Sequence, residues 1–129
     1  MIPEAWLVSK VLGSTNISQY STQMFFNYIP ETKQPPAVVY KIIGFQRNRL
    51  QKTKVYSLTC LHNNALQTEN MNNQLYMLFD NSTQYIRESS SNLCVENVFI
   101  LENGKGDFDE ENKYYYRVLD IAVSYRNII

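Results

Sequence analysis

The residues most capable of chemistry are one histidine and two cysteines, and their spacing supports little catalysis. His62 is the only histidine, so it is the only side chain whose ordinary pKa suits a general base near neutral pH. It lies between a strand-like and a helix-like segment, where a structural or exposed histidine is far more common than a catalytic one. Cys60 and Cys94 form no CxxC pair, and a structural zinc site would need more ligands than these three residues supply. We expect no catalytic residue, no metal site and no cofactor, and interpret both cysteines as small buried apolar side chains.

The segment GDFDEE (106–111) has the acidic density of a calcium loop but not its pattern. The glycine that should follow the acidic ligands is missing, and the twelfth position counted from Asp107 is Val118 instead of glutamate. A solvated acidic loop is the better interpretation. The sequence also contains no GxGxxG, Walker A or HExxH motif, so nothing predicts nucleotide or zinc-protease chemistry. We therefore predict that the protein is not an enzyme.

Three consecutive tyrosines, Tyr114 to Tyr116, raise the possibility of a platform that stacks nucleic-acid bases. In a strand, however, successive side chains point to opposite faces, so only Tyr114 and Tyr116 can share one. Lys plus Arg and Asp plus Glu each total 12, which gives zero net charge and no basic footprint for nucleic acid or an anionic membrane. A small nucleic-acid-binding α+β domain stays an alternative of lower rank.

The polar composition points towards association between proteins. The chain has 14 Asn and 8 Gln but only 19% charged residues, and it has 10 Tyr and 6 Phe. A neutral, amide-rich surface does not repel other copies, and aromatic side chains are favoured where surfaces become buried on association. AT-biased codon usage would produce the same composition without any function, so this observation alone decides nothing.

Hydrophobic periodicity predicts one domain covering residues 1–129, with a short helix over 3–12 and a hairpin of strands 37–45 and 53–62. Asn63 or Asn64 can cap a second helix that begins at Ala65 and reaches Asp80. Residues 14–36 are poorly defined, with a possible short strand over 23–29, and residues 81–92 have the composition of a loop.

Two further strands, 93–101 and 112–126, complete the predicted sheet. The expected order is α-(β)-β-β-α-β-β, an α+β fold whose antiparallel sheet of at least four strands carries its helices on one face. No apolar run reaches the roughly 18 residues that a membrane helix needs, and the N-terminal residues do not have the pattern of a signal peptide. We expect no association with a membrane.

One charge asymmetry remains after these exclusions. The first hairpin tip is basic and the last one is acidic, and we predict that the two meet across a subunit boundary. The alternative is that both are solvated loops. A head-to-tail contact between unlike patches generates a ring if the rotation closes, and complementary charges would set its register. The candidate interface residues are Arg47, Arg49, Lys52, Lys54, Asp107, Asp109, Glu110 and Glu111.

The order of elements resembles that of the tail-terminator, or tail-completion, proteins of long-tailed bacteriophages. The resemblance is carried by the N-terminal helix, the strand PPAVVYKIIG, the unit KVYSLTCLHNNALQTENMNNQLYMLF and the closing hairpin ENVFILENGKGDFDEENKYYYRVLDIAVSYR. It implies a small α+β subunit of a hexameric ring that caps the completed tail tube and joins it to the head. The family has no catalytic motif, so the resemblance assigns no functional residue.

The resemblance also implies partners and a location. The partners would be other copies of the chain, the tail-tube protein and the head-completion or neck proteins, with DNA only as cargo passing through the lumen. The protein would be assembled in the host cytoplasm and reside in the tail or neck of the virion. Another neck or head-closure connector is the alternative of the same class.

Overall fold

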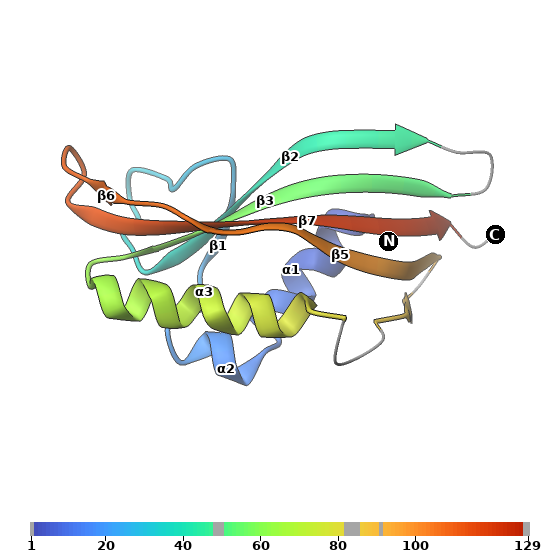
Figure 1. Cartoon of the computed structure of the whole chain (residues 1–129), viewed down its shortest axis with the longest axis horizontal. Helices are drawn as coiled ribbons and strands as arrows, with labels where there is room; N and C mark the ends of the chain where they lie inside the picture. The colour runs from blue at the N-terminus through green and yellow to red at the C-terminus, as the bar shows by residue number, and fades with distance from the viewer. Residues whose placement is uncertain (1, 48–50, 82–85, 91, 128–129) are drawn as a thin grey trace.

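A computed structural model describes residues 2–47, 51–81, 86–90 and 92–127 of the chain. In chain order its elements are α1 (Pro3–Leu12), α2 (Thr15–Ser18), β1 (Met24–Phe26), β2 (Ala37–Arg47), β3 (Lys52–His62), α3 (Ala65–Phe79), β4 (Glu88–Ser90), β5 (Leu93–Lys105), β6 (Phe108–Asp109) and β7 (Tyr114–Asn127). In Figure 1 the long strands β2, β3, β5 and β7 run along the length of the molecule. The expected α+β class is confirmed.

The sheet is mixed, so the expectation of a purely antiparallel sheet is wrong. Its strand order is β1-β2-β3-β7-β5-β4, with β6 paired to β7. All pairings are antiparallel except that of β1 with β2, in which Met24 lies beside Val38. The loop over residues 27–36 carries the chain back to the start of β2, and this return makes the two strands parallel. A three-residue strand has too little pattern to reveal such a pairing in the sequence.

The element order is also richer than the predicted α-(β)-β-β-α-β-β. The structure adds α2, β4 and β6, each four residues long or shorter. The possible strand over 23–29 forms only at Met24–Phe26, and β4 lies within the segment expected to be a loop. Short strands such as β1, β4 and β6 are stabilised by their neighbours in the sheet and carry little propensity of their own.

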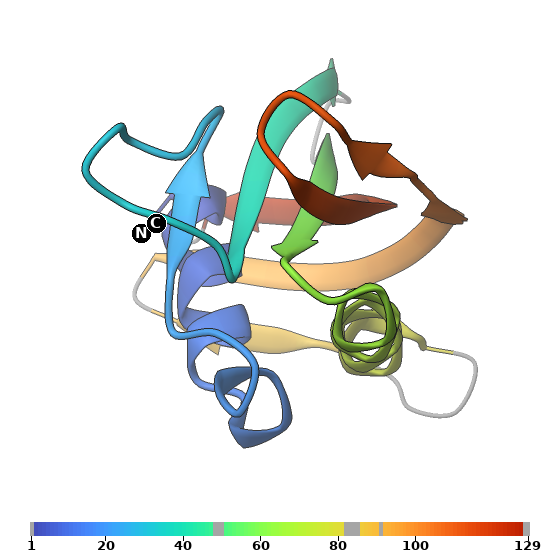
Figure 2. The ribbon, with the colours of Figure 1, turned by 90° about the vertical axis from the view of Figure 1, so that its left-hand side faces the viewer.

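One face of the sheet packs against both long helices. The β7 side chains Leu119, Ile121 and Val123 are fully buried and join a single apolar cluster with residues of α1 and α3. Trp6 of α1 and Phe79 of α3 meet within this cluster, with ring centroids 6.4 Å apart. Figure 2 shows α1 and α3 on the same side of the curled sheet. We call this the covered face and the opposite one the open face.

Local signals set the ends of both helices. α1 begins at Pro3, whose missing N–H costs nothing in the first turn, and Glu4 there suits the positive end of the helix dipole. α3 begins after Asn64, whose side chain accepts a hydrogen bond from the Gln67 backbone N–H at 3.0 Å. The predicted helix over 3–12 is confirmed, and α3 ends one residue earlier than predicted.

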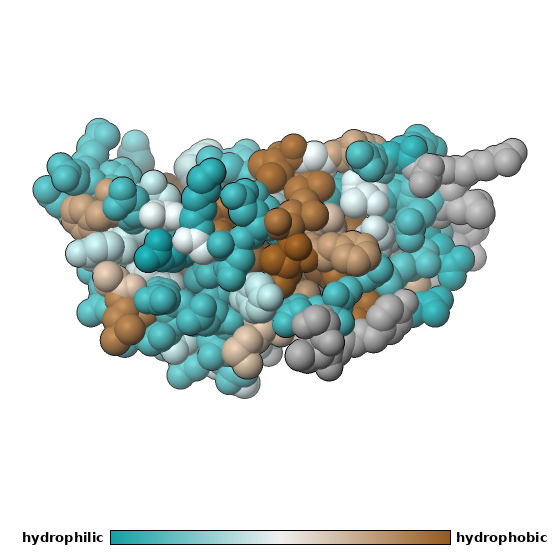
Figure 3. All heavy atoms as spheres, in the orientation of Figure 1, coloured by the Kyte–Doolittle hydropathy of each residue, from teal (hydrophilic) through white to brown (hydrophobic). Residues whose placement is uncertain are grey.

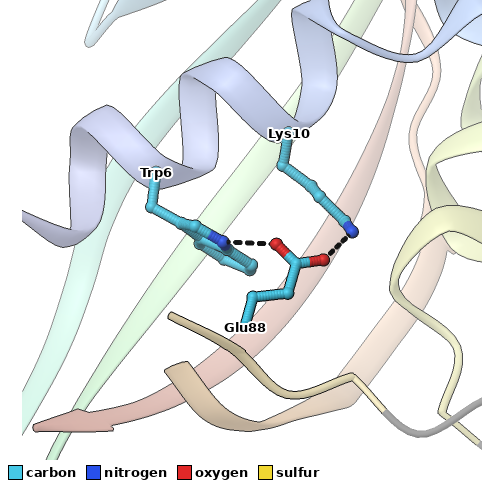
Figure 4. Close-up of polar contacts among 3 residues, drawn as sticks. All are labelled: Trp6, Lys10 and Glu88. Atoms are coloured by element: carbon cyan, nitrogen blue, oxygen red, sulfur yellow. Dashed lines mark hydrogen bonds and ion pairs between the residues drawn. The ribbon is translucent and has the colours of Figure 1, made fainter. Parts of the chain in front are cut away.

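A polar contact ties α1 to the edge strand β4 (Figure 4). The Glu88 carboxylate accepts a hydrogen bond from the Trp6 indole Nε1 at 2.9 Å and pairs with the Lys10 ammonium. Burial alone would raise the pKa of Glu88, but the hydrogen bonds from Lys10 and Trp6 and the charge of Lys10 outweigh it and lower the pKa. The contact therefore stabilises α1 on the covered face with Glu88 ionised.

Candidate interaction surface

The basic end of the molecule is where β2 ends and β3 begins. Arg47 is the last residue of β2 and is exposed, and Lys52 is the first residue of β3 and is partly buried. These two residues pair with each other in the antiparallel register. Arg49 lies outside the described residues. Of the predicted interface cations, Arg47 and Lys52 therefore lie at this end.

Lys54, another predicted interface residue, is already engaged within the chain. Its ammonium donates a hydrogen bond to the Glu4 carboxylate of α1 at 2.6 Å and lies 5.9 Å from the centre of the Phe45 ring. An ion pair of this kind fixes α1 against β3 on the covered face. Glu4 lies far from Lys54 in the sequence, so no local pattern could have revealed the pair.

The acidic end is formed by β6 and the turn that follows it. Asp107, Glu110 and Glu111 are exposed. Asp109 instead shapes the turn, because its Oδ1 accepts hydrogen bonds from the backbone N–H groups of Glu111 and Asn112, each at 3.1 Å. The side-chain and backbone hydrogen bonds from Asn112 are the main cause that holds the pKa of Asp109 below its usual value. Three acidic side chains of this end thus remain at the surface.

The two charged ends lie at opposite ends of the sheet (Figure 1). In the register, Lys52 lies beside Tyr125 near the end of β7, whereas Asp109 lies beside Tyr114 at its start. The eleven residue-to-residue steps from Tyr114 to Tyr125 span about 36 Å along an extended strand. The basic and acidic ends are therefore too far apart to meet within one chain.

The open face carries an apolar row across the middle of the sheet. Val55 of β3 pairs with Ala122 of β7, which pairs with Phe99 of β5, and the Phe99 side chain is 50% exposed. Polar rows lie on both sides of it, Ser57–Asp120–Glu102 and Thr53–Ser124–Asn97. In Figure 3 hydrophobic side chains gather over the crossing strands, with hydrophilic ones towards both ends of the molecule.

A groove of about 560 Å³ lies on the open face near the acidic end. It is bounded by residues 27–35, by the turn around Asp109 and by Tyr114 and Tyr116 of β7. The charged side chains in its lining have mixed sign: Glu31, Lys33, Lys41 and Asp109. Such a lining gives no preference for an anion or a cation, and the groove presents no catalytic cluster.

The sequence comparisons identify no relative. The chain matches no protein-family model and no curated protein. The described residues contain no group of His, Cys, Asp and Glu side chains that could hold a metal ion. In the same part of the chain, no helix has both the length and the apolar character needed to cross a membrane.

The residues first considered for chemistry have structural roles. His62 Nδ1 accepts a hydrogen bond from the Asn64 backbone N–H at 3.1 Å, at the junction before α3. Cys60 and Cys94 are buried and unpaired, as the sequence predicted, and burial raises the pKa of the Cys60 thiol. Tyr115 packs on Phe108 with ring centroids 4.6 Å apart, whereas Tyr114 and Tyr116 line the groove on the other face.

Sequence reasoning missed the exposed apolar residues of the edges. The run AVVYKIIGF has the pattern of a strand buried on both sides, yet β1 covers only Val38 to Tyr40 of β2. Beyond this point Ile43 is 54% and Phe45 is 52% exposed. Predicting this exposure would have required knowing that β1 pairs with only three residues of β2, and the sequence does not show that pairing.

Proposed function

We propose that the protein is a non-enzymatic structural component of a bacteriophage virion, a tail terminator. Copies of the chain form a ring, hexameric by the resemblance of the sequence to that family, which caps the tail tube and joins it to the neck. The α+β fold and the size of the chain are consistent with this role. In such a ring DNA passes through the lumen, so the subunit needs no excess of positive charge.

One observation carries the proposal: charges of opposite sign lie at opposite ends of the same sheet. Arg47 and Lys52 are at one end, and Asp107, Glu110 and Glu111 are at the other. Because these groups cannot neutralise one another within the chain, they are available to pair with groups on another molecule. A contact between unlike patches of identical copies is heterologous, and such contacts form rings when the rotation closes and open stacks when it does not.

Charge reversal tests this proposal. Arg47→Glu should weaken assembly at low salt, and adding Asp107→Lys and Glu110→Lys should partly restore it, since the charges are then exchanged. Size-exclusion chromatography with light scattering and negative-stain imaging measure the assembly. Lys33→Glu, an equal charge change in an exposed loop, is the matched control and should leave assembly unchanged.

A second experiment separates a terminator from another neck component. The purified protein is added to tail-tube subunits of the same phage while these polymerise, and tube lengths are measured by electron microscopy. A terminator should cap the tubes and shorten them in proportion to its concentration. Tubes that grow to their usual length, together with a wild-type chain that is monomeric at every concentration and salt, would contradict the proposed function.

A further inference from the structure

Both edges of the central sheet are open over part of their length. β1 pairs with β2 only at Val38, Val39 and Tyr40, and β4 pairs with β5 only from Leu93 to Val95. Among the described residues, no strand pairs with the outer edge of β2 from residue 41 to residue 47, or with that of β5 from residue 97 to residue 105. We call these segments the β2 edge and the β5 edge.

The two edges lie at the same level of the sheet. Following the register across the strands, Lys41 lies beside Ser57, which lies beside Asp120, which lies beside Glu102. In this register the β2 edge lies level with residues 120–125 of β7, and the β5 edge lies level with residues 118–124 of the same strand. A second copy placed beside the first therefore brings the two edges together without sliding along the strands.

The strand directions also suit such a contact. β2 is antiparallel to β3, β3 to β7, and β7 to β5, so β2 and β5 run in opposite directions. Copies related by rotation about an axis along the strands keep these directions. The β2 edge of one copy and the β5 edge of the next would therefore be antiparallel, the arrangement in which strands pair most often.

The side chains of both edges are unusually apolar for exposed positions. The most exposed are Ile43 at 54% and Phe45 at 52% on the β2 edge, with Phe99 at 50% and Leu101 at 58% on the β5 edge. Exposed edge strands normally carry charges and bulges that prevent pairing with other chains. Both edges have such charges and bulges, but they also present exposed apolar side chains, which indicate surfaces that become buried.

A pair of opposite charges marks the same contact. Lys41 and Glu102 are exposed, lie at one level and point to the open face. Within one chain they are separated by β3 and β7, a distance of about 14 Å at the ordinary strand spacing. In a second copy placed edge to edge they become cross-strand neighbours, where opposite charges stabilise the pairing.

We propose that the β2 edge of one copy packs against the β5 edge of a second copy and continues the sheet between subunits. The inference deepens the proposed function, on which it rests, by naming the surfaces that join the ring. β5 has register shifts between Val95 and Asn97, between Ile100 and Glu102, and between Asn103 and Lys105. These bulges limit backbone pairing to short stretches, so the contact depends on matching side chains and excludes unrelated strands.

This arrangement determines what the charged ends do. When copies stand side by side, the basic ends gather at one rim of the ring and the acidic ends at the other. The contact between charged ends then joins one ring to the next along the strand direction, so Arg47→Glu should weaken this stacking, whereas the edge substitutions should weaken the ring itself. The edge contact and the contact between charged ends are thus tested by different substitutions.

The first test exchanges the edge charges. Lys41→Glu or Glu102→Lys alone should raise the concentration needed for half-assembly about tenfold, and the two together should restore it. Assembly is measured by light scattering and folding by circular dichroism, which should not change because both positions are exposed. Glu31→Lys and Lys33→Glu, both in an exposed loop, are the charge-matched controls.

The second test captures the contact covalently. In the double variant Lys41→Cys and Glu102→Cys, a disulfide cannot form within one copy, because the two residues lie on the opposite outer strands of a four-strand stretch. Mild oxidation should therefore give a ladder of linked copies that ends at the size of the ring, whereas Lys33→Cys with Glu102→Cys should not. Cys60 and Cys94 are buried and contribute little background.

The outcomes separate the two proposals. Loss of assembly on edge reversal, recovery in the double exchange and a disulfide ladder support the edge contact. Rings that form normally with either edge reversed, and that give no ladder, overturn the edge contact while the proposed ring stands. A wild-type chain that never assembles overturns both.

Discussion

The covered and open faces belong to the same four strands, yet they differ in what their side chains contact. On β7, Ile121 is fully buried beneath the helices, whereas the next residue, Ala122, lies in the apolar row of the open face beside half-exposed Phe99. Alternation along a strand thus places a residue of the buried core and a residue of the candidate interaction surface one position apart. The comparison implies that truncating a buried side chain of the covered face should destabilise the chain more than truncating an exposed side chain of the open face.

The largest expected effect comes from truncating the covered face. Ile121→Ala removes a fully buried side chain from the apolar cluster and should lower the free energy of unfolding by about 3 kcal/mol. Urea unfolding followed by circular dichroism measures this change. The reason is that the surrounding core can close only part of the cavity that the truncation leaves.

Phe99→Ala is the matched substitution on the open face. Because its side chain is half exposed, it should change the free energy of unfolding by less than about 1 kcal/mol. A loss as large as that of Ile121→Ala would show that the open face is part of the folded core. The distinction between the two faces would then be wrong.

The next expected effect concerns the close backbone contact between Gly106 and Tyr116 at the acidic end of the sheet. A Cβ added at Gly106 would lie 2.0 Å from the carbonyl oxygen of Tyr116, where no side chain can move aside. Gly106→Ala should therefore cost about 2 kcal/mol, as overpacking against a fixed neighbour does. Thermal unfolding gives the value.

Gly104 provides the control for this substitution. Its φ is +89°, but a Cβ there would meet no atom within 4 Å. Gly104→Ala should cost about 1 kcal/mol from backbone strain alone. If the two alanine variants are equally stable, β5 and β7 do not approach as closely at this end as the structure places them.

The sequence predicted the local features of the molecule better than the distant ones. The helix over 3–12 was predicted, and so was a helix from Ala65 capped by Asn63 or Asn64, of which Asn64 is the cap. These signals are local, because caps and periodicity depend on neighbouring residues. The parallel pairing of β1 with β2 depends on residues over a dozen positions apart, and a strand of three residues carries no pattern for it.

For the candidate surface, too, the sequence predicted local features and not the contacts between distant residues. The charge runs located both charged ends, but they did not show that Glu4 engages Lys54 or that Asp109 holds its own turn. The open edges escaped prediction for a physical reason. The sequence of an apolar strand is the same whether its edge pairs with a strand of the same chain or is left open to another copy. Only the topology of the sheet distinguishes a paired edge from an open one.

A smaller effect is expected from the cap that holds α3 in place over the covered face. Asn64→Ala removes the acceptor for the Gln67 backbone N–H and should cost about 1 kcal/mol. Asn63→Ala, at the exposed neighbouring position, is the control and should be nearly neutral. Chemical denaturation of both variants checks the difference. Equal losses would mean that α3 does not begin where the structure places it.

The smallest effect concerns the contact that holds α1 against the edge of the sheet. The pKa of Glu88 is lower in the folded chain than in the unfolded one, so its contribution to stability is present above the unfolded value of about 4.3 and is lost as the pH falls through the folded value. Glu88→Gln keeps the shape but not the charge. At pH 7 the variant should be less stable by at most about 1 kcal/mol, because the pair is partly exposed.

The pH profile distinguishes this cause from a loss of packing. The difference in unfolding free energy between wild type and Glu88→Gln should shrink from pH 6 towards pH 3 (approximate limits set by the carboxyl pKa range), as the wild-type carboxylate takes up a proton. A difference that stays constant across this range would mean that Glu88 holds α1 by shape alone, and that its charge plays no part in keeping the helix on the covered face.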